Sequence, residues 1–167
     1  MARLNVGDQA PDFELLNQNE ESISLSNFKG EKIVVVFFYP KDETPGCVKE
    51  VCAFRDSYED FTKIGAEVIG ISSDSVASHK LFALNRRLPF HLLSDPKGKV
   101  RKQYDVSGSF MGFVPGRETF VIGKQGIVRH RFSSQFQIDQ HIDEAMRIVK
   151  ELVDAADHFP PLVCQLL

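Results

Sequence analysis

The chain has 167 residues, of which 43% are hydrophobic and 26% are charged, with a formal net charge of −3. This size suits one packed core, and the charge gives no electrostatic reason to expect binding to nucleic acid or to an anionic membrane. Three cysteines are too few for an extracellular disulfide framework, and no segment approaches the roughly 18 consecutive apolar residues of a membrane span. The N-terminus lacks the apolar run of a signal peptide, so we expect a cytoplasmic protein, or a plastid protein if a transit peptide has been removed.

The first half of the chain alternates predicted strands with a helix. Short strands at 13–15 and 23–25 are expected to form an N-terminal hairpin. Residues 32–38 form a continuous apolar run, which is typical of a central strand covered on both faces. A helix is expected at about 45–64, followed by a second buried strand at 66–72. This alternation indicates an α/β fold.

The second half ends in an antiparallel pair and a helix. A helix capped by a serine is predicted over 75–87. Strands at 118–122 and 127–132 flank the turn sequence Gly-Lys-Gln-Gly and are expected to pair as a hairpin. Apolar residues recur at helical spacing over 138–153, which gives the last helix one apolar face. Together these elements predict a mixed central sheet flanked by helices.

An apolar tail follows the last helix. Pro160 and Pro161 must end that helix, because proline lacks the N–H donor and clashes with the preceding turn. We therefore expect residues 1–157 to form the folded domain and residues 158–167 to form a tail. The tail is expected to pack on the body with Cys164 as a buried apolar residue, and an accessory thiol or a self-association patch is the alternative.

The start of the predicted helix at 45–64 places a thiol where its anion is favoured. Thr44 followed by Pro45 is typical of a helix N-cap and a proline at the first helical position, which puts Cys47 at the third. Unpaired N–H groups and the positive end of the helix dipole favour the thiolate there. A free thiol has a pKa near ~8.5, so even ~1.4 kcal/mol of stabilisation raises its thiolate-to-thiol ratio about tenfold. The alternative is that Cys47 is a small buried apolar residue at an ordinary helix start.

A second cysteine, Cys52, lies five residues after Cys47. In an intact helix their Cα atoms would be roughly 8 to 9 Å apart, beyond the ~7 Å limit for a disulfide. The spacing also differs from the Cys-x-x-Cys of dithiol oxidoreductases and lacks the second ligand pair of a zinc site. It suits a cycle in which Cys47 reacts while the helix is formed and Cys52 attacks the product once the helix opens.

These residues carry a family resemblance. The pattern from Pro40 through Thr44 to Cys47, Pro-x-x-x-Thr-x-x-Cys, matches the signature of the peroxiredoxins. The run Thr-Pro-Gly-Cys-x-x-Glu-x-Cys, which ends at Cys52, resembles the peroxiredoxin Q branch, also called bacterioferritin comigratory protein. Further similar stretches are residues 6–13, 93–95 and 115–120. The resemblance implies a thioredoxin-like fold and a thiol peroxidase.

The resemblance also implies roles for individual residues. Cys47 would be the peroxidatic cysteine and Cys52 the resolving one. The Thr44 hydroxyl would orient the sulfur and the peroxide, Pro40 would shield the site, and Arg117 would be the cation beside the thiolate.

Three more residues are weaker candidates. Glu50 fits the branch pattern, but a glutamate on an exposed helix face explains it equally well, so we expect at most a supporting role. Phe110 and Phe113 lie in a glycine-punctuated stretch just before Arg117. They are expected either to form an apolar collar that favours alkyl hydroperoxides or to fill the core beneath the loop.

The expected reaction is attack of the Cys47 thiolate on the terminal oxygen of hydrogen peroxide or an alkyl hydroperoxide, which gives a sulfenic acid. This chemistry requires no metal and no organic cofactor. The resemblance implies recycling by thioredoxin or a glutaredoxin-like donor, and a monomer. A peroxide-sensing protein on the same fold, which signals through a partner, is the alternative, and the absence of Cys-x-x-Cys argues against a disulfide reductase.

Overall fold

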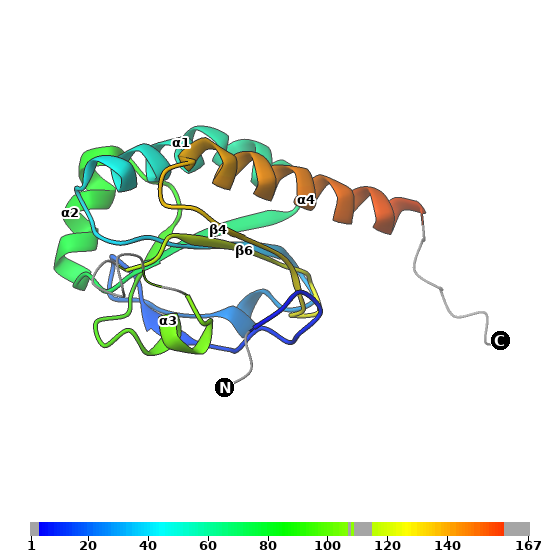
Figure 1. The fold of residues 1–167 in the computed structure, drawn as a ribbon, viewed down its shortest axis with the longest axis horizontal. Coiled ribbons are helices and arrows are strands. Elements are labelled where there is room, and N and C mark those ends of the chain that lie inside the picture. Colours follow the sequence, from blue (N-terminus) through cyan, green and yellow to red (C-terminus); the bar gives the residue numbers. More distant parts are fainter. Residues whose placement is uncertain (1–3, 107, 109–114, 159–167) are drawn as a thin grey trace.

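The structure is a computed structural model, and it describes residues 4–106, 108 and 115–158. Its centre is a five-stranded sheet in the order β5-β4-β3-β6-β7 (Figure 1). Strand β4 pairs in parallel with both β3 and β5, whereas β6 is antiparallel to β3 and to β7. The strands are β3 (Ile33–Phe38), β4 (Ala66–Ser72), β5 (His91–Ser94), β6 (Glu118–Ile122) and β7 (Val128–Ser133).

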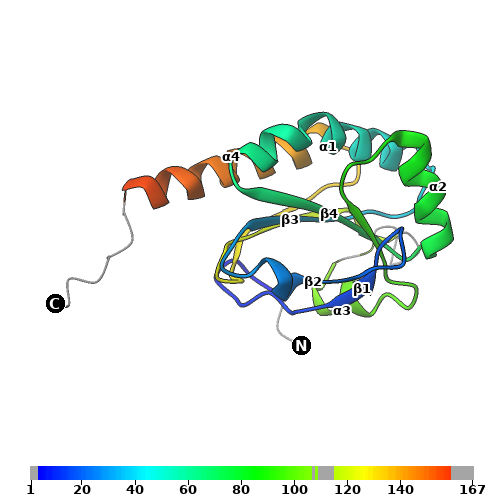
Figure 2. The same cartoon turned by 180° about the vertical axis from the view of Figure 1, so that it is seen from behind.

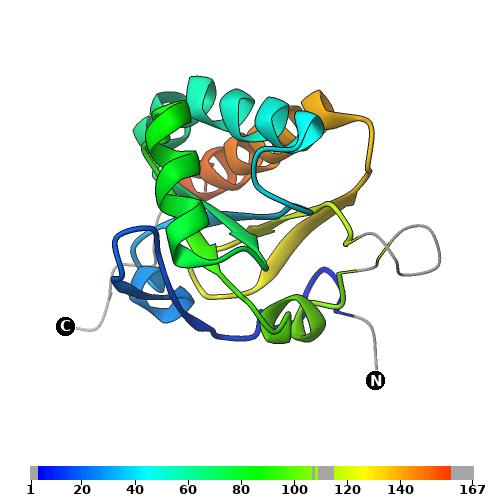
Figure 3. The ribbon, with the colours of Figure 1, turned by 90° about the vertical axis from the view of Figure 1, so that its left-hand side faces the viewer.

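Helices cover one face of this sheet, and shorter elements cover the other. The helical layer consists of α1 (Pro45–Lys63), α2 (Val76–Arg86) and α4 (Ile138–His158). The opposite face carries α3 (Lys99–Gln103), the short 3-10 helix η1 (Leu25–Phe28) and the hairpin of β1 (Glu14–Leu16) and β2 (Ser22–Ser24) (Figures 1 and 2). Figure 3 shows the sheet between the helical layer and α3.

The side chains of β3 enter two hydrophobic cores, one on each face of the sheet, which explains the uninterrupted apolar sequence of this strand. All six of its side chains are buried. Val35 and Phe37 pack in the core beneath α1 and α4, whereas Val36 and Phe38 pack in the core on the opposite face. A strand covered on both faces has no solvated side, so alternation with polar residues is absent.

Most predicted elements are confirmed, with differences in the short ones. The N-terminal hairpin strands lie one residue away from the predicted positions, at 14–16 and 22–24. Strand β5 and the helices α3 and η1 were not predicted, because four or five residues carry too little periodicity to separate a strand from a turn. Helix α4 continues to His158, and the rest of the tail, including Cys164, lies outside the described residues. No helix of the described part is long and apolar enough to cross a membrane.

The register of β3 and β6 brings two distant segments together. Phe38, the last residue of β3, pairs with Glu118, the first residue of β6. The segment after β3, which contains Pro40 and Thr44, therefore lies beside the segment before β6, which contains Arg117. This arrangement is set by long-range pairing rather than by any local sequence pattern.

Candidate active site

Helix α1 begins as the sequence predicts, with Thr44 as the N-cap residue and Pro45 at the first helical position. The first hydrogen bond of the helix runs from the Val48 N–H to the Thr44 carbonyl at 2.8 Å. The N–H groups of Gly46 and Cys47 lie before this bond, in the part of the first turn that has no acceptor within the helix. The first turn of α1 contains no acidic residue, and the Cys47 side chain is fully buried. The thiol therefore lies at the positive end of a 19-residue helix.

The hydroxyl of Thr44 does something other than cap the helix. Its Oγ1 donates a hydrogen bond to the Lys41 carbonyl at 2.7 Å and makes no side-chain cap bond. This bond uses the hydroxyl proton and leaves the oxygen lone pairs available to accept from a ligand. Pro40, just before Lys41, is half-buried.

Arg117 bridges two groups on α1. Its Nη2 donates to Cys47 Sγ at 3.5 Å, and its Nη1 donates to Glu50 Oε1 at 3.1 Å. Both Cys47 and Glu50 are 0% exposed, so the alternative of an exposed helix face for Glu50 is wrong. Gly46 makes room for the guanidinium, since a Cβ at this position would lie 3.0 Å from Arg117 Nη2.

The second oxygen of Glu50 faces a histidine that the sequence did not single out. Glu50 Oε2 has no hydrogen-bond partner among the described residues and lies 3.8 Å from His141 Nδ1. His141 Nε2 lies 2.7 Å from the Ser134 carbonyl, so Nε2 carries the proton and Nδ1 accepts from the Thr119 hydroxyl at 2.8 Å. Burial lowers the pKa of His141 to about 4, and burial raises the pKa of Glu50 to about 7 against the opposing effect of Arg117. We call Cys47, Glu50, Arg117 and His141 the Glu50 cluster.

Arg101 on α3 is a second guanidinium that the sequence did not reveal. It donates to the Tyr39 carbonyl at 2.9 Å and to the Gly116 carbonyl at 2.8 Å. These carbonyls immediately precede Pro40 and Arg117, so one side chain joins the two segments that form the site. Burial lowers the pKa of Arg101, and nearby anionic groups oppose that shift.

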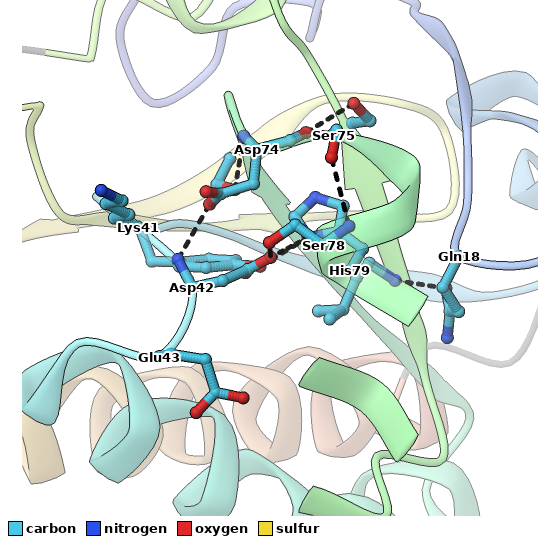
Figure 4. Close-up of polar contacts among 12 residues, drawn as sticks. Gln18, Lys41, Asp42, Glu43, Asp74, Ser75, Ser78 and His79 are labelled. Atoms are coloured by element: carbon cyan, nitrogen blue, oxygen red, sulfur yellow. Dashed lines mark hydrogen bonds and ion pairs between the residues drawn. The ribbon is translucent and has the colours of Figure 1, made fainter. Parts of the chain in front are cut away.

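A separate buried cluster holds the segment between β3 and α1 (Figure 4). Asp42 Oδ1 accepts from the Tyr39 hydroxyl at 2.6 Å, and Asp42 Oδ2 accepts from Ser78 and from His79 Nδ1, both at 2.8 Å. His79 Nε2 lies 3.0 Å from the Leu93 carbonyl. Because both ring nitrogens face acceptors, both must carry protons, and His79 is an imidazolium paired with Asp42. We call Tyr39, Asp42, Ser78 and His79 the Asp42 cluster.

Asp74 extends the anchoring of this segment. Its Oδ2 accepts from the Asp42 N–H at 2.8 Å and from the Ser72 hydroxyl at 2.6 Å. Asp42, Asp74 and His79 come close enough together to suggest a metal site. Both oxygens of Asp42 already accept from protein donors, so the group is better described as a hydrogen-bonded anchor.

Glu43 connects this anchor to the helix start. Its backbone has φ 60, a left-handed conformation that non-glycine residues seldom adopt. The Glu43 carboxylate pairs with Arg86 on α2 at 3.0 Å. The residue just before Thr44 is therefore held in a strained conformation by its neighbours.

The remaining predicted site residues are Cys52, Phe110 and Phe113. Cys52 is half-buried on the same continuous helix as Cys47, and both thiols are free. The separation estimated for an intact helix, roughly 8 to 9 Å between Cα atoms, therefore applies to this pair. Phe110 and Phe113 lie outside the described residues.

Comparison with known proteins places this chain in a family. Residues 6–131 match the AhpC/TSA family. The chain is 52% identical to the chloroplastic peroxiredoxin Q of Populus jackii over 151 residues, which is 90% of this chain and 70% of that protein. It is 54% identical to the chloroplastic peroxiredoxin Q of Arabidopsis thaliana over 149 residues, 89% of this chain and 68% of the relative.

Solved structures agree with the sequence relatives. Peroxidoxin BcpB from Mycobacterium tuberculosis superimposes with a TM-score of 0.83 at 38% identity and covers 90% of this chain and 99% of its own. The bacterioferritin comigratory protein of Xanthomonas campestris, described for its alkyl peroxide reduction activity, gives a TM-score of 0.80 at 28% identity and covers 92% and 99%. The fold is thioredoxin-like, as the family resemblance implied. A buried thiol at a helix start beside an arginine, on this fold and with these relatives, shows that the chain belongs to the AhpC/TSA family as a peroxiredoxin of the Q branch, a thiol peroxidase.

Proposed function

We propose that this chain reduces hydrogen peroxide and alkyl hydroperoxides, with Cys47 as the attacking thiolate and Cys52 as the resolving thiol. The observation that carries the proposal is the 3.5 Å contact between Arg117 Nη2 and Cys47 Sγ at the N-terminus of α1. A guanidinium and a helix dipole together stabilise a buried thiolate, which is the nucleophilic form of cysteine.

In the first step the Cys47 thiolate attacks the terminal oxygen of the hydroperoxide. The S–O bond forms as the O–O bond breaks, and the leaving oxygen takes a proton to become water or an alcohol. Arg117 and the free amides of the first turn offer donors to the developing charge. The lone pairs of the Thr44 hydroxyl offer an acceptor for the O–H of the substrate, and Pro40 forms a wall that limits access by water.

In the second step the Cys52 thiol attacks the Cys47 sulfenic acid, which gives a disulfide and water. Because an intact helix holds the two cysteines roughly 8 to 9 Å apart, the first turns of α1 must open. A dithiol donor such as thioredoxin or a glutaredoxin-like protein then reduces the bridge. This cycle needs no metal or organic cofactor.

Several finer features belong to the same proposal. Phe110 and Phe113 would form an apolar collar for bulky hydroperoxides, in line with the alkyl peroxide activity described for the Xanthomonas campestris relative. The chain would act as a monomer, with residues 1–157 as the catalytic domain and 158–167 as an accessory tail. The chloroplastic names of the relatives favour the plastid alternative over the cytoplasmic expectation.

The test is peroxide consumption in the presence of thioredoxin, thioredoxin reductase and NADPH. Wild type should turn over many times, Cys47→Ser should be inactive, and Cys52→Ser should complete one oxidation and then stop. Cys164→Ser is the matched control and should retain full turnover. Stoichiometric oxidation without turnover in the wild type would instead favour a peroxide sensor. Normal recycling by Cys52→Ser together with failure of Cys164→Ser would assign resolution to the tail.

Opening of the helix can be tested separately by hydrogen exchange. After stoichiometric peroxide, the amides from Gly46 to Phe54 should lose protection, and Cys52→Ser should keep it. A mass-confirmed bridge with unchanged protection would contradict the proposed opening.

A further inference from the structure

One cation in the site serves two acidic groups. Arg117 donates through Nη2 to Cys47 and through Nη1 to Glu50, and all three side chains are at most 5% exposed. We propose that Cys47 and Glu50 share one acidic proton through Arg117, so that the Glu50 carboxyl takes up the proton that the thiol gives up. This inference rests on the proposed function only in taking Cys47 as the reactive thiolate.

The charge balance of the cluster supports the exchange. If Cys47 and Glu50 were both ionised, two buried anions would face one guanidinium, and like charges at close range disfavour each other's ionised form. His141, the titratable group that faces Glu50 from α4, has its protonated nitrogen bonded to Ser134 and brings no positive charge. Arg101 acts electrostatically on Cys47 from α3, but its hydrogen bonds go to the carbonyls of the neighbouring segments.

The surroundings of Glu50 favour its protonated form. Its Oε2 is buried without a donor and lies 3.8 Å from the accepting nitrogen of His141. A carboxylate oxygen without a donor and opposite an acceptor is unfavourable, and protonation of Glu50 removes that buried negative charge. Burial raises the pKa of Glu50 to about 7, although Arg117 opposes the shift, so the carboxyl can hold a proton close to neutral pH.

The proton count of the reaction follows directly. In the reactive state Cys47 is a thiolate and Glu50 is a carboxylic acid. After the sulfur has taken oxygen from the hydroperoxide, Cys47 is an uncharged sulfenic acid, and Arg117 is left with Glu50 as its remaining acidic partner. Glu50 then ionises and releases one proton, which equals the proton that the leaving oxygen requires. The site thus returns to the same net charge without taking up a proton from solvent.

The first test is the thiolate titration of Cys47, followed by ultraviolet absorbance in a Cys52→Ser/Cys164→Ser background where Cys47 is the remaining cysteine. With Glu50 present, ionisation should be spread over two coupled steps. Glu50→Gln removes the competing anion but keeps an oxygen for Arg117, so the titration should become a single step with its midpoint lower by about one pH unit. A higher or unchanged midpoint would overturn the proposal, because a residue that only orients Arg117 would weaken the thiolate when replaced.

The second test measures the reciprocal effect and does not require Glu50→Gln to fold well. Coupling between two sites must be equal in both directions, so removing the thiolate should make Glu50 a stronger acid. Carbon-13 carboxyl NMR should therefore show the Glu50 titration moving to lower pH in Cys47→Ser than in the parent background. An unchanged Glu50 titration would reject the shared proton. Neither titration uses peroxide, so a failed peroxidase assay and a failed coupling remain separate results.

Discussion

The two buried clusters beside the segment from Tyr39 to Cys47 differ in how completely their polar atoms are bonded. In the Asp42 cluster both carboxylate oxygens and both nitrogens of His79 have partners at 2.6 to 3.0 Å. In the Glu50 cluster, by contrast, Glu50 Oε2 and Arg117 Nε are buried without partners among the described residues.

This difference indicates separate tasks. A fully bonded ionic cluster fixes one geometry and resists a change of charge. This suits a cluster that anchors the segment containing Pro40 and Thr44. An incompletely bonded cluster has more than one protonation state of similar energy, which suits the groups that must exchange charge during a reaction. The comparison predicts that the same chemical substitution, acid to amide, destabilises the protein much more in the Asp42 cluster than in the Glu50 cluster.

The largest expected effect is on stability. Asp42→Asn should lower the free energy of unfolding by about 3 to 5 kcal/mol, because it leaves the buried His79 imidazolium without its counter-charge. Glu50→Gln is the matched change, and at pH 8 it should cost about 1 kcal/mol or less, since it replaces an anion that burial already disfavours. Urea unfolding of both variants at pH 8 measures the difference. Equal losses would remove the distinction between the clusters.

The next effect is on pH dependence. Glu50, with a folded pKa of about 7 against 4.5 for the ordinary group, contributes stability that is fully present below pH 4.5 and lost as pH rises to 7. His141, with a folded pKa of about 4 against 6.5, contributes stability that is present above pH 6.5 and lost as pH falls to 4. In the wild type the Glu50 contribution to stability therefore falls with rising pH, whereas the His141 contribution rises.

Single substitutions should separate these two contributions to the pH dependence of stability. From pH 5 to 7 the stability of His141→Gln should fall relative to the wild type, and that of Glu50→Gln should rise, each by roughly 2 kcal/mol. Denaturant unfolding at several pH values checks both signs. Slopes of the same sign in the two variants would contradict the assigned protonation states.

A smaller effect should follow from disconnecting the two segments of the site. Arg101→Met leaves the Tyr39 and Gly116 carbonyls without their donor, so kcat/KM for hydroperoxide should fall roughly tenfold, or ~1.4 kcal/mol. Lys102→Met, an exposed change on the same helix, is the control and should have no effect. An active Arg101→Met variant would show that β3 and β6 alone align the site.

The smallest effect concerns Gly46. Gly46→Ala should strengthen the helix by up to about 1 kcal/mol, yet its Cβ would meet Arg117 Nη2 at 3.0 Å and displace the guanidinium. We expect kcat/KM to fall a few-fold while the thermal midpoint stays level or rises. Unchanged activity would mean that Arg117 can shift without loss of its contact to Cys47.

The sequence predicted the features that depend on local pattern. The start of α1, the position of Cys47 in its first turn and the buried strands β3 and β4 all follow from capping, spacing and apolar runs. Arg117 was assigned through family resemblance, and its place beside Cys47 follows from the antiparallel register of β3 and β6.

The sequence could not predict the supporting charges. Arg101, His141 and His79 reach the site from three different helices, and isolated histidines and arginines have no spacing that distinguishes a buried partner from a solvated one. The burial of Glu50 was missed for a related reason, because the helix face that carries it is covered by Arg117 and α4 only in the folded chain. The Thr44 hydroxyl was also unpredictable, since its bond to Lys41 depends on the strained turn at Glu43.

The aromatic contact of Phe54 bears on how α1 would recover after each turn of the proposed cycle. Phe54 follows Cys52 by two residues, is fully buried and stacks on Phe37 with ring centroids 4.4 Å apart. In the proposed cycle, the opening that joins Cys52 to Cys47 would therefore end at Phe54, and the helix beyond it would persist as a template. Starting a new helix is costly, whereas adding residues to an existing one is fast and nearly free of that cost. After reduction of the proposed bridge, the first turns of α1 would be rebuilt by propagation from this remaining helix rather than by fresh nucleation.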